Sequence, residues 1–368
     1  MQDAPIIDVN TLDEWLTTGK EVTVLDIRPK DQREEWQIPG SLYADAYKRL
    51  RQGDYSVMDE VSLPENVPVV AVCAAGNTSK IAARELRKKG IEAYSLEQGM
   101  KGWSLAWNKA TISFESYQIV QLRRTGKGCL SYVIASNGEA IAIDASLPIE
   151  VYENILRKNN WKLKSVMETH IHADHLSRSK QLSDYYKVPL LLPAPNKVTF
   201  SHGKIEHDQL IRLGNISVEA IATPGHTLES VCFLVNDEVL FTGDTLFTNA
   251  VGRPDLKASE EETKNRTGLL FDSLHKLMKL NDTIIVLPAH TGSPIAFDEK
   301  PVEATLSEIK NKIPLLQLSK EEFVKTILSR LPDTPNNYLA IVERNLSGDM
   351  SDIDPIDLEA GANRCAVP

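Results

Sequence analysis

Cysteine is scarce in this sequence and positive charge is not in surplus, and both shortages limit what the protein can be. Only four of the 368 residues are cysteines, and they are widely separated without paired spacing, which argues against a disulfide framework. Lys and Arg number 41 against 51 Asp and Glu, for a formal net charge of -10. Binding of nucleic acid by counterion release requires clustered basic residues instead, so we expect no nucleic-acid partner.

Long apolar runs are also missing. The first residues lack a basic segment followed by an apolar one, and no uninterrupted apolar run is long enough to span a bilayer. We therefore expect a cytoplasmic protein with no membrane partner. The composition, 42% hydrophobic and 25% charged, is that of a soluble globular protein. Because 368 residues exceed what one hydrophobic core usually supports, we expect more than one domain.

The first part of the chain alternates short apolar segments with an amphipathic one. Residues 22–26, 67–72 and 91–96 are apolar and short, as buried parallel strands are. Residues 79–89 have helical periodicity and end before a glycine. This alternation predicts a small α/β domain with a parallel sheet and flanking helices.

The later part of the chain is richer in strand patterns. Two hairpins are predicted, at Asn137-Gly138 and at Asn236-Asp237, because each dipeptide separates two apolar segments of strand length. Residues 261–280 have the pattern of a helix. These features predict a strand-rich α/β domain.

Two segments mark the expected boundaries of these domains. Residues 108–116 show no strong periodicity where the pattern changes, so we place the junction there. After about Ser347 several aspartates indicate an acidic, loop-like tail. The chain is therefore expected to consist of domains at 1–110 and 111–345 and a tail at 346–368.

One short stretch concentrates metal-binding side chains. His170, His172, Asp174 and His175 fall within six consecutive positions after an apolar segment. Such groups are costly to bury unless they are paired or bound to a metal. Three further residues of the same kinds each follow a later apolar segment, namely His226, Asp244 and His290. The strand ends would bring them to one rim, which predicts a metal site.

These residues resemble the motif of the metallo-β-lactamase superfamily, His-x-His-x-Asp-His followed by a distant His, Asp and His. The seven positions are filled by His170, His172, Asp174, His175, His226, Asp244 and His290. The resemblance spans about residues 115–345, and the ordered match is highly specific. It implies an αββα sandwich for the second domain.

Two kinds of metal chemistry fit these ligands. A dinuclear zinc centre would place His170, His172 and His226 at one ion, Asp174, His175 and His290 at the other, and Asp244 between them. Its metal-bound hydroxide would attack a thioester, as in glyoxalase II-like hydrolases. A mononuclear Fe(II) centre would use only His170, His226 and Asp244 and keep positions open for substrate and dioxygen. The ligands alone do not decide between them.

Two short segments favour the iron centre. Residues 252–255, Gly-Arg-Pro-Asp, look like the Gly-Arg-x-Asp segment of persulfide dioxygenases more than the corresponding glyoxalase II segment. Residues 362–365, Ala-Asn-Arg-Cys, are similar to the ending of that same subfamily. Arg253 would clamp a substrate carboxylate or merely pair with Asp255.

A cysteine at the end of a predicted strand is the second candidate for chemistry. Cys73 follows residues 67–72 and precedes a predicted helix. The turn would aim backbone N–H groups and the positive end of the helix at its sulfur, lowering the thiol pKa and stabilising an anionic persulfide. The substrate-binding loop would consist of Ala74, Ala75, Gly76, Asn77, Thr78 and Ser79.

The first 110 residues look like a single rhodanese domain. The resemblance rests on Cys73 with its loop, on Asp26-Ile27-Arg28, on Ile38-Pro39-Gly40-Ser41 and on Gly99-Met100-Lys101-Gly102-Trp103. The family usually has Arg where Ala74 stands, and His is common at Gln37. Without an arginine at position 74, the loop lacks a cation that could bind sulfite or thiosulfate. Asp26 and Arg28 are expected to be an orienting pair.

The remaining cysteines and histidines are assigned no chemistry. Cys129 and Cys232 lie in apolar segments and are predicted to be inert core thiols. His202 and His207 lie in a polar loop, and His275 lies within the predicted helix.

The two resemblances together imply a persulfide dioxygenase fused to a rhodanese. Fe(II) would oxidise a low-molecular-weight thiol persulfide, such as glutathione persulfide, with O2 to sulfite and thiol. Cys73 would transfer sulfane sulfur to or from thiosulfate, and Asp174 is the other candidate catalytic residue. Asp174 would orient ligands, substrate or water, together with His172, His175 and His290.

Two alternatives remain open for the whole protein. One is a dinuclear zinc thioester hydrolase, and the other is a sulfur-carrier module in which Cys73 relays persulfide and the metal is structural. A structural zinc site needs just four closed ligands, so the complete ligand set argues against the carrier. The sequence is also compatible with a homodimer.

Overall fold

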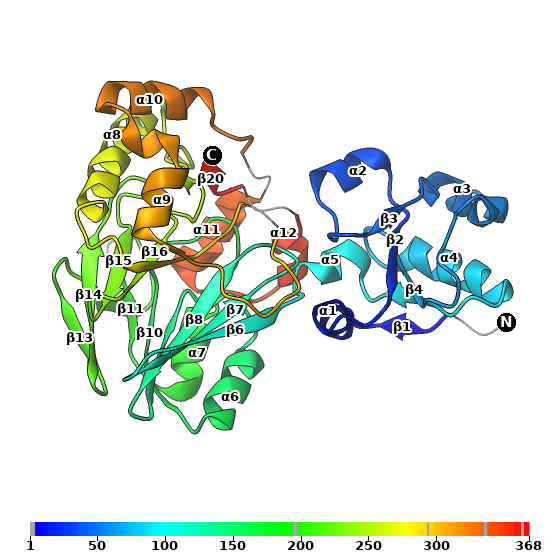
Figure 1. Ribbon diagram of the computed structural model, residues 1–368, viewed down its shortest axis with the longest axis horizontal. Helices are drawn as coiled ribbons and strands as arrows, with labels where there is room; N and C mark the ends of the chain where they lie inside the picture. Colours follow the sequence, from blue (N-terminus) through cyan, green and yellow to red (C-terminus); the bar gives the residue numbers. More distant parts are fainter. Residues whose placement is uncertain (1–3, 194–196, 293, 335–336, 362–363, 368) are drawn as a thin grey trace.

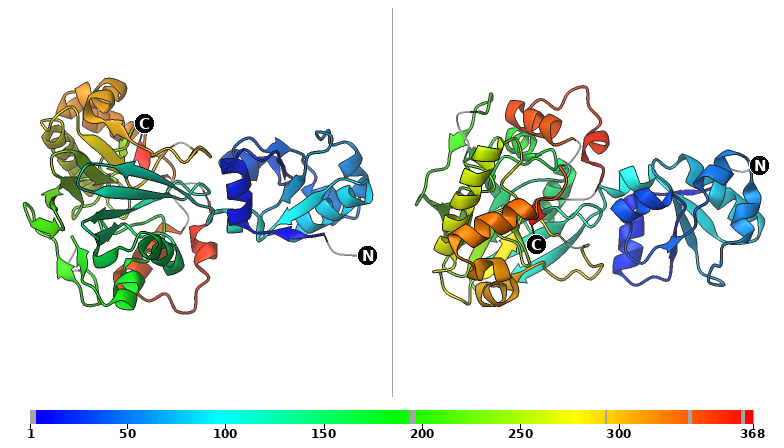
Figure 2. Two further views of the ribbon diagram at one scale, coloured as in Figure 1. Left: turned by 60° about the horizontal axis from the view of Figure 1, so that its bottom comes forward. Right: turned by 90° about the horizontal axis from the view of Figure 1, so that it is seen from above.

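The computed structural model of the protein has two lobes that lie side by side (Figure 1). It describes residues 4–193, 197–292, 294–334, 337–361 and 364–367. The smaller lobe holds the first part of the chain, and the two further views keep the lobes next to each other (Figure 2). Among the described residues, no helix combines the length and the apolar character that a bilayer crossing requires.

The N-terminal lobe is built on a five-stranded parallel sheet in the order β1-β5-β4-β2-β3. Its strands are β1 (Ile6–Ile7), β2 (Thr23–Asp26), β3 (Leu42–Tyr43), β4 (Val69–Val72) and β5 (Ala93–Leu96). Its helices are α1 (Val9–Thr17), α2 (Lys30–Glu35), α3 (Tyr47–Arg51), the 3-10 helix η1 (Tyr55–Asp59), α4 (Asn77–Lys88) and α5 (Gly99–Trp103). β2 and β4 are buried along their whole length because helices cover both faces of the sheet.

The second lobe contains two large sheets whose inner faces pack together. The first has seven strands in the order β12-β11-β10-β9-β8-β7-β6. Its bounds are β6 (Asn108–Ser113), β7 (Gln118–Arg123), β8 (Leu130–Ser136), β9 (Glu139–Ile143), β10 (Lys162–Met167), β11 (Leu190–Leu192) and β12 (Gly203–Lys204). Tyr132 of β8 meets Phe241 of the other sheet edge-on, with ring centroids 4.9 Å apart, in the core between the sheets.

The second sheet has six strands in the order β13-β14-β15-β16-β18-β19. Its bounds are β13 (Leu210–Leu213), β14 (Ile216–Ala222), β15 (Val231–Val235), β16 (Val239–Gly243), β18 (Ile285–Pro288) and β19 (Ala304–Thr305). A separate ribbon pairs β17 (Val251–Gly252) antiparallel with β20 (Ala366–Val367). The chain end thereby joins a loop that follows β16.

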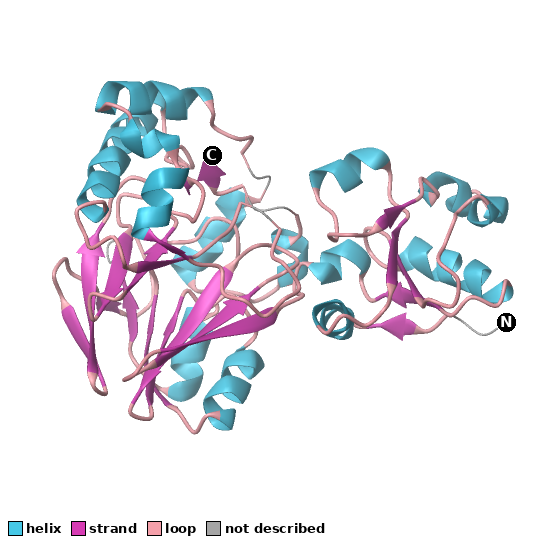
Figure 3. Cartoon of the chain, in the orientation of Figure 1, coloured by secondary structure: helices cyan, strands magenta, loops and turns pink. Residues whose placement is uncertain are grey.

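Helices cover the outer faces of both sheets, which completes four layers (Figure 3). The seven-stranded sheet packs against α6 (Ile149–Lys158) and α7 (Ser179–Tyr186). The six-stranded sheet packs against α8 (Glu260–Leu277), α9 (Leu306–Lys312), the 3-10 helix η2 (Pro314–Gln317) and α10 (Lys320–Ser329). The remaining helices are α11 (Tyr338–Ser347) and α12 (Pro355–Glu359). The predicted αββα sandwich is confirmed.

Both predicted hairpins are present. β8 and β9 pair across Asn137 and Gly138, whose φ angles are 51° and 77°. β15 and β16 pair across Asn236 and Asp237, whose φ angles are 48° and 55°. Positive φ at both central residues gives a turn whose twist matches that of the strands, and Asn, Asp and Gly tolerate it best.

Two regions differ from the sequence-based expectation. Residues 108–116 include β6, an edge strand paired antiparallel with β7. Its alternation was hidden because Ala110 is the only apolar residue among its fully buried positions. The segment after Ser347, expected to be loop-like, contains α12 and β20. Both elements are short and are held by tertiary contacts, which local periodicity does not reveal.

Candidate metal centre

The metal-binding side chains follow the ends of four strands. The loop of His170 and His172 follows β10, and His226 follows β14. Asp244 comes directly after β16, and His290 comes two residues after β18. β16 and β18 run parallel, so their carboxyl ends meet at one edge. The structure brings the four strand ends close to one another, since His170, His226 and Asp244 form one group and His290 contacts Asp244.

Three of these residues form a compact group. One donor atom each of His170, His226 and Asp244 lies within 4.8 Å of the other two. Asp244 Oδ2 is 3.8 Å from His170 Nε2 and 3.7 Å from His226 Nε2. All three side chains are buried. Two imidazoles and a carboxylate together are a donor set that binds divalent transition metals.

Buried polar atoms without partners test whether a metal fits here. Among the described residues, His170 Nε2, His172 Nδ1 and Asp244 Oδ2 have no hydrogen-bond partner. An unsatisfied buried polar atom is costly, and native proteins rarely keep several together. A cation between His170 Nε2 and Asp244 Oδ2 would satisfy both of these atoms, so the residues fit a metal.

Hydrogen bonds fix which nitrogen of each histidine faces the group. His226 Nδ1 donates to the carbonyl oxygen of Arg253 at 2.7 Å, so its Nε2 lone pair is left for a metal. Thr169 donates its hydroxyl to Asp144 at 2.9 Å. The same hydroxyl oxygen lies 3.0 Å from His170 Nδ1 and can therefore accept from it. His170 likewise keeps the Nε2 lone pair.

Burial and neighbouring charges give the three residues suitable charge states. Burial lowers the pKa of His170 well below its usual value, and His172 and His226 lower it further. Burial also lowers the pKa of His226. Burial alone would raise the pKa of Asp244, but His290 lowers it below its usual value. Neutral imidazoles beside a carboxylate are the ionisation states in which these groups bind metals.

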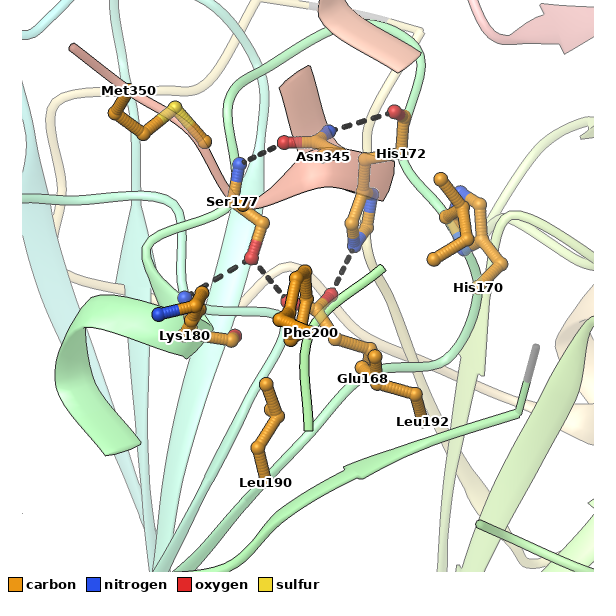
Figure 4. Close-up of a pocket in the computed structure, with 13 residues that line it drawn as sticks. Glu168, His170, His172, Ser177, Lys180, Leu190, Leu192, Phe200, Asn345 and Met350 are labelled. Carbon is orange, nitrogen blue, oxygen red and sulfur yellow. Dashed lines mark hydrogen bonds and ion pairs between the residues drawn. The ribbon is translucent and has the colours of Figure 1, made fainter. Parts of the chain in front are cut away.

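His172 is oriented differently from His170. Its Nε2 lies 2.9 Å from Glu168 Oε2 and 3.3 Å from Asp144 Oδ1, and Figure 4 shows the ring turned toward Glu168. Burial opposes protonation, but Glu168 and Asp144 raise the pKa of His172 well above its usual value. Its other nitrogen, Nδ1, points away from these carboxylates. Glu168 was not singled out from the sequence.

A second donor group adjoins the first. His290 Nε2 is 2.7 Å from Asp174 Oδ2, and His175 Nδ1 is 3.1 Å from Asp174 Oδ1. His290 also connects the two groups, because its Nδ1 is 2.5 Å from Asp244 Oδ1. Cys129 belongs to this group as well, with its Sγ 3.2 Å from Asp174 Oδ2.

The contact between Cys129 and Asp174 corrects a prediction. We expected Cys129 to be an inert thiol in an apolar core, but its sulfur faces buried polar ligands. Cys232 is different, because its Sγ contacts Thr223 Oγ1 and the carbonyl oxygen of Thr242 and lies in none of the donor groups found among the described residues.

Arg253 is also corrected as a substrate-binding residue. It is fully buried, and its Nε and Nη2 donate to the two oxygens of Asp255 at 2.9 and 2.7 Å. Its remaining N–H groups donate to the carbonyl oxygens of Pro332, Asp333 and Arg364. Because all five donors are engaged, none is left for a substrate carboxylate.

The glycine before Arg253 is required by close packing on the metal loop. A Cβ atom at Gly252 would lie 1.8 Å from the carbonyl oxygen of Asp244. Residues 251–253 therefore pack directly against the loop that carries Asp244. The residues of the Gly-Arg-x-Asp segment thus have a structural role beside the centre. Gly252 allows the close contact with Asp244, and Arg253 donates to the carbonyl oxygen of Arg364.

Two residues that were not predicted from the sequence hydrogen-bond to the histidine loop, residues 170–176. Asn345 of α11 donates Nδ2 to the carbonyl oxygens of His172 and His175, both at 2.9 Å (Figure 4 shows the first). Glu359 of α12 accepts the backbone N–H of Leu176 at 2.7 Å. Both side chains are buried. Nothing in the local pattern marks them, since their partners lie more than 160 residues away.

A cavity of about 170 Å³ opens beside His226. Ile171 and Ala173 of the histidine loop line it together with Tyr338. Its charged lining residues are of both signs: Lys197, Glu229, Lys257, Glu262 and Arg266. The cavity is large enough to receive part of a small, charged molecule beside the metal group.

The Cys73 loop has the conformation of a strand-to-helix turn. Cys73 follows β4 and is buried, and its Sγ lies 3.3 Å from Ser79 Oγ. Gly76 adopts a positive φ of 79° directly before α4. Ala74, Ala75, Asn77 and Thr78 complete the turn between β4 and α4, with Asn77 and Thr78 in its first helical positions. Asp26 and Arg28 form the expected pair, with Nη2 and Oδ2 2.7 Å apart.

Comparisons with known proteins agree with both lobes. The pattern of the metallo-beta-lactamase superfamily matches residues 124–290, and that of the rhodanese-like domain matches residues 8–106. The "Probable polyketide biosynthesis zinc-dependent hydrolase BaeB" of Bacillus velezensis is 30% identical over 205 residues, which are 52% of this chain and 84% of that protein. Hydroxyacylglutathione hydrolase of Francisella philomiragia is 26% identical over 216 residues, 55% of this chain and 83% of that protein.

A solved structure is similar over nearly all of its length. ETHE1 from Myxococcus xanthus aligns with a TM-score of 0.55 and 26% identity, covering 62% of this chain and 97% of that one. The fold and its buried His/Asp groups thus define the class, a metal-binding αββα enzyme fold joined to a rhodanese-like domain. The chain belongs to the metallo-β-lactamase superfamily, and the rhodanese-like domain precedes that part of it.

Proposed function

We propose that the protein is a persulfide dioxygenase with a fused sulfurtransferase domain. The observation that carries the proposal is the compact group of His170, His226 and Asp244, whose metal-facing atoms lie within 4.8 Å of one another. A two-histidine, one-carboxylate face is the donor set of mononuclear Fe(II) oxygenases. The likeness to ETHE1, and the Gly-Arg-x-Asp resemblance with its packing on Asp244, support the same assignment.

The proposed reaction converts a thiol persulfide, O2 and water to the thiol, sulfite and two protons. Fe(II) held by His170, His226 and Asp244 would bring sulfur and dioxygen together and exchange electrons with them. Arg253 and Thr169 would keep the two imidazoles in the metal-facing tautomer through their contacts with Nδ1. Asp174 would orient substrate or water from the adjoining group, as its contact with His290 allows.

The cavity beside His226 would receive the body of the thiol. Lys197, Lys257 and Arg266 offer positive charge, and Glu229 and Glu262 offer negative charge. A zwitterionic peptide thiol such as glutathione would meet both signs. The persulfide sulfur would then extend along Ile171 and Ala173 toward the metal group.

Cys73 would carry the sulfane sulfur in the N-terminal domain. Its position between β4 and α4 places it at the amino end of a twelve-residue helix, where an anionic persulfide is stabilised. Sulfur would move from thiosulfate to Cys73, or from a persulfide at Cys73 to sulfite. Sulfite is also the product proposed for the metal domain, so the two domains would share one intermediate.

Oxygen uptake tests the proposal. Protein loaded with Fe(II) without oxygen is expected to consume O2 when glutathione persulfide is added and to release sulfite. Asp244→Ala removes the carboxylate of the group and is expected to reduce uptake to background and to lower the bound iron. His202→Ala, which changes a loop histidine outside both donor groups, serves as the matched control and should keep full activity.

The result that would overturn the proposal is equally specific. Iron-loaded protein that takes up no oxygen with glutathione, coenzyme A or cysteine persulfide, while zinc-loaded protein cleaves a glutathione thioester, identifies a hydrolase instead. The adjoining group of Asp174, His175 and His290 favours this second candidate, because two neighbouring donor groups can hold two ions. The hydrolase names of two relatives point the same way.

A further inference from the structure

Arg266 of α8 keeps one N–H group unpaired although its side chain is buried. Its Nη1 donates to the carbonyl oxygen of Leu256 at 3.1 Å, and its Nη2 donates to the carboxylate of Glu262. Among the described residues, Nε has no hydrogen-bond partner, although the residue is just 8% exposed. A buried donor of a charged group is costly to leave without an acceptor. Such a donor indicates a position where a bound molecule supplies the acceptor.

The arginine lies at the cavity beside the metal group. Arg266 and His226 both line this cavity of about 170 Å³. α8 packs closely on the loop of His226, because a Cβ atom at Gly225 would lie 2.4 Å from the Cα of Leu270. Leu270 follows Arg266 by four residues, which is about one helical turn of 5.4 Å. Arg266 is therefore about one turn from the point where the helix touches the histidine loop.

Contacts on several sides hold the guanidinium of Arg266 in place. Leu256, which accepts from Nη1, also lines the cavity. Glu262 lies one turn earlier on the same face of α8. The helix itself is tied to the loop, since Ser273 Oγ donates to the carbonyl oxygen of Pro224 at 2.7 Å. A guanidinium that is already ordered loses little entropy when it binds a ligand.

We propose that Arg266 binds a carboxylate of the thiol substrate and thereby selects peptide thiols, such as glutathione, over thiols that lack a carboxylate. The inference rests on the proposed function, in which this cavity receives the body of the thiol. The planar guanidinium matches a carboxylate in shape, and the hydrogen bond from Nε is charge-assisted. Arg253, for which the sequence left such a role open, has its donors engaged within the protein.

The acidic residues of the cavity decide which anion fits beside the arginine. Glu229 and Glu262 line the cavity together with Arg266. A phosphate group with two negative charges would be repelled by these carboxylates, whereas an ammonium group would be attracted to them. Glutathione carries an ammonium group as well as carboxylates. Coenzyme A carries phosphates and has neither of these groups, so the cavity favours the peptide thiol.

Calorimetric titration of the full-length, metal-loaded protein without oxygen tests the assignment. The probes are glutathione, its diethyl ester, in which both carboxylates are blocked, and coenzyme A. Wild-type protein is expected to bind glutathione about tenfold more tightly than the ester, and Arg266→Gln is expected to bind the two equally, because one charge-assisted hydrogen bond contributes about that factor. Lys264→Gln removes a positive charge from an exposed position of the same helix and should bind as the wild type does.

A conservative variant separates the geometry of Arg266 from its charge. Arg266→Lys keeps the positive charge but lacks the planar donors, so it should lose most of the preference for glutathione over the ester. This variant also decides the matter if Arg266→Gln fails to fold, and a full preference in Arg266→Lys would then refute the role.

Four further results overturn the proposal. They are no binding of glutathione by the wild type, equal binding of glutathione and the ester by the wild type, a preference that survives in Arg266→Gln, and tighter binding of coenzyme A that depends on Arg266. None of these measurements involves oxygen uptake. Arg266 can therefore keep its role if the protein proves to be a glutathione thioester hydrolase, and the dioxygenase can stand if Arg266 does not bind the carboxylate.

Discussion

Each buried histidine of the centre is defined by what its two ring nitrogens contact. His226 gives one nitrogen to a backbone carbonyl and keeps the other for the metal group. His172 instead directs one nitrogen at Glu168 and Asp144, which raises its pKa. Histidines in two neighbouring loops therefore have pKa values shifted in opposite directions, because their neighbours differ.

Replacement of Cys73 by serine separates the two proposed activities. The hydroxyl of the introduced serine can keep the contact with Ser79, so the loop should retain its structure. We expect sulfur transfer from thiosulfate to cyanide to fall to background, because serine cannot form a persulfide, while oxygen uptake at the metal centre is unchanged. Both rates are measured on the same preparation. Cys232→Ser is the control, and transfer that persists without Cys73 would refute its role.

The sequence was informative about which residues form the centre and less so about their contacts. The histidines and aspartates were predicted because ligand types recur after successive apolar segments. Cys129 was misjudged because a cysteine between apolar residues gives no sign of the carboxylate it will meet. For Arg253 the sequence left a substrate clamp and a pair with Asp255 open, because its carbonyl partners, such as those of Pro332 and Arg364, are distant in the sequence.

At the scale of elements, α11 and α12 stabilise a loop to which they are not adjacent in sequence. Glu359 of α12 pairs with Arg124, Nη2 to Oε2 at 3.2 Å, and all of its side chain is buried. Arg178 lies 3.5 Å from its other oxygen. The carboxylate thus joins the histidine loop, through Leu176, to two buried cations.

Glu359→Gln is expected to destabilise the protein by about 3 kcal/mol at pH 7, because it leaves buried arginine charge uncompensated. Unfolding in urea with and without bound metal measures this. Gln keeps an acceptor for Leu176, so the loss should come from charge. Glu343→Gln, a change at an exposed position of α11, is the control and should have little effect.

The same carboxylate makes stability depend on pH. Burial alone would raise the pKa of Glu359, but Arg124 and Arg178 lower it below the usual 4.5. Its contribution is therefore fully present above about pH 4.5 and is lost as the pH falls through the lower value of the folded state. Wild-type and Glu359→Gln stabilities should converge in that acidic range. A constant difference down to about pH 3 would contradict this account.

Elements with strong local signals could be predicted, and elements held by distant contacts could not. The turn at Asn137-Gly138 follows from the φ angles that these residues tolerate. β6 has too few apolar residues to show its alternation, and α12 is only five residues long. Both exist because other parts of the chain pack on them, as α5 does on α12 (Figure 1).

At the scale of the whole molecule, the two lobes are joined by specific side-chain contacts. Thr125 donates its hydroxyl to the buried Asp13 of α1. Arg364, near the chain end, donates to Glu35 at 3.0 Å. Trp103 of the first lobe meets Phe297 of the second, with ring centroids 6.1 Å apart. The first lobe is thus attached by these contacts as well as by the connecting segment, residues 104–107.

Gly126 allows a close approach between the lobes. A Cβ atom there would lie 1.7 Å from the carbonyl oxygen of Trp103. We expect Gly126→Ala to separate the lobes, with a larger radius of gyration in X-ray scattering and faster proteolysis near residue 107. Gly268→Ala, whose Cβ would meet only the flexible end of Lys320, is the control. Unchanged scattering by the first variant would contradict the role of Gly126.

The hydrogen bonds of Asn345 and Glu359 with residues 172–176 decide how far a fragment containing only the second lobe must extend. The superfamily pattern stops at residue 290. A fragment that ended there would retain every proposed iron ligand but would lack Asn345 and Glu359, which hydrogen-bond the loop after β10 that carries His170. Such a fragment should be poorly metallated for reasons unrelated to its ligands. A minimal expression fragment needs to run from β6 through β20.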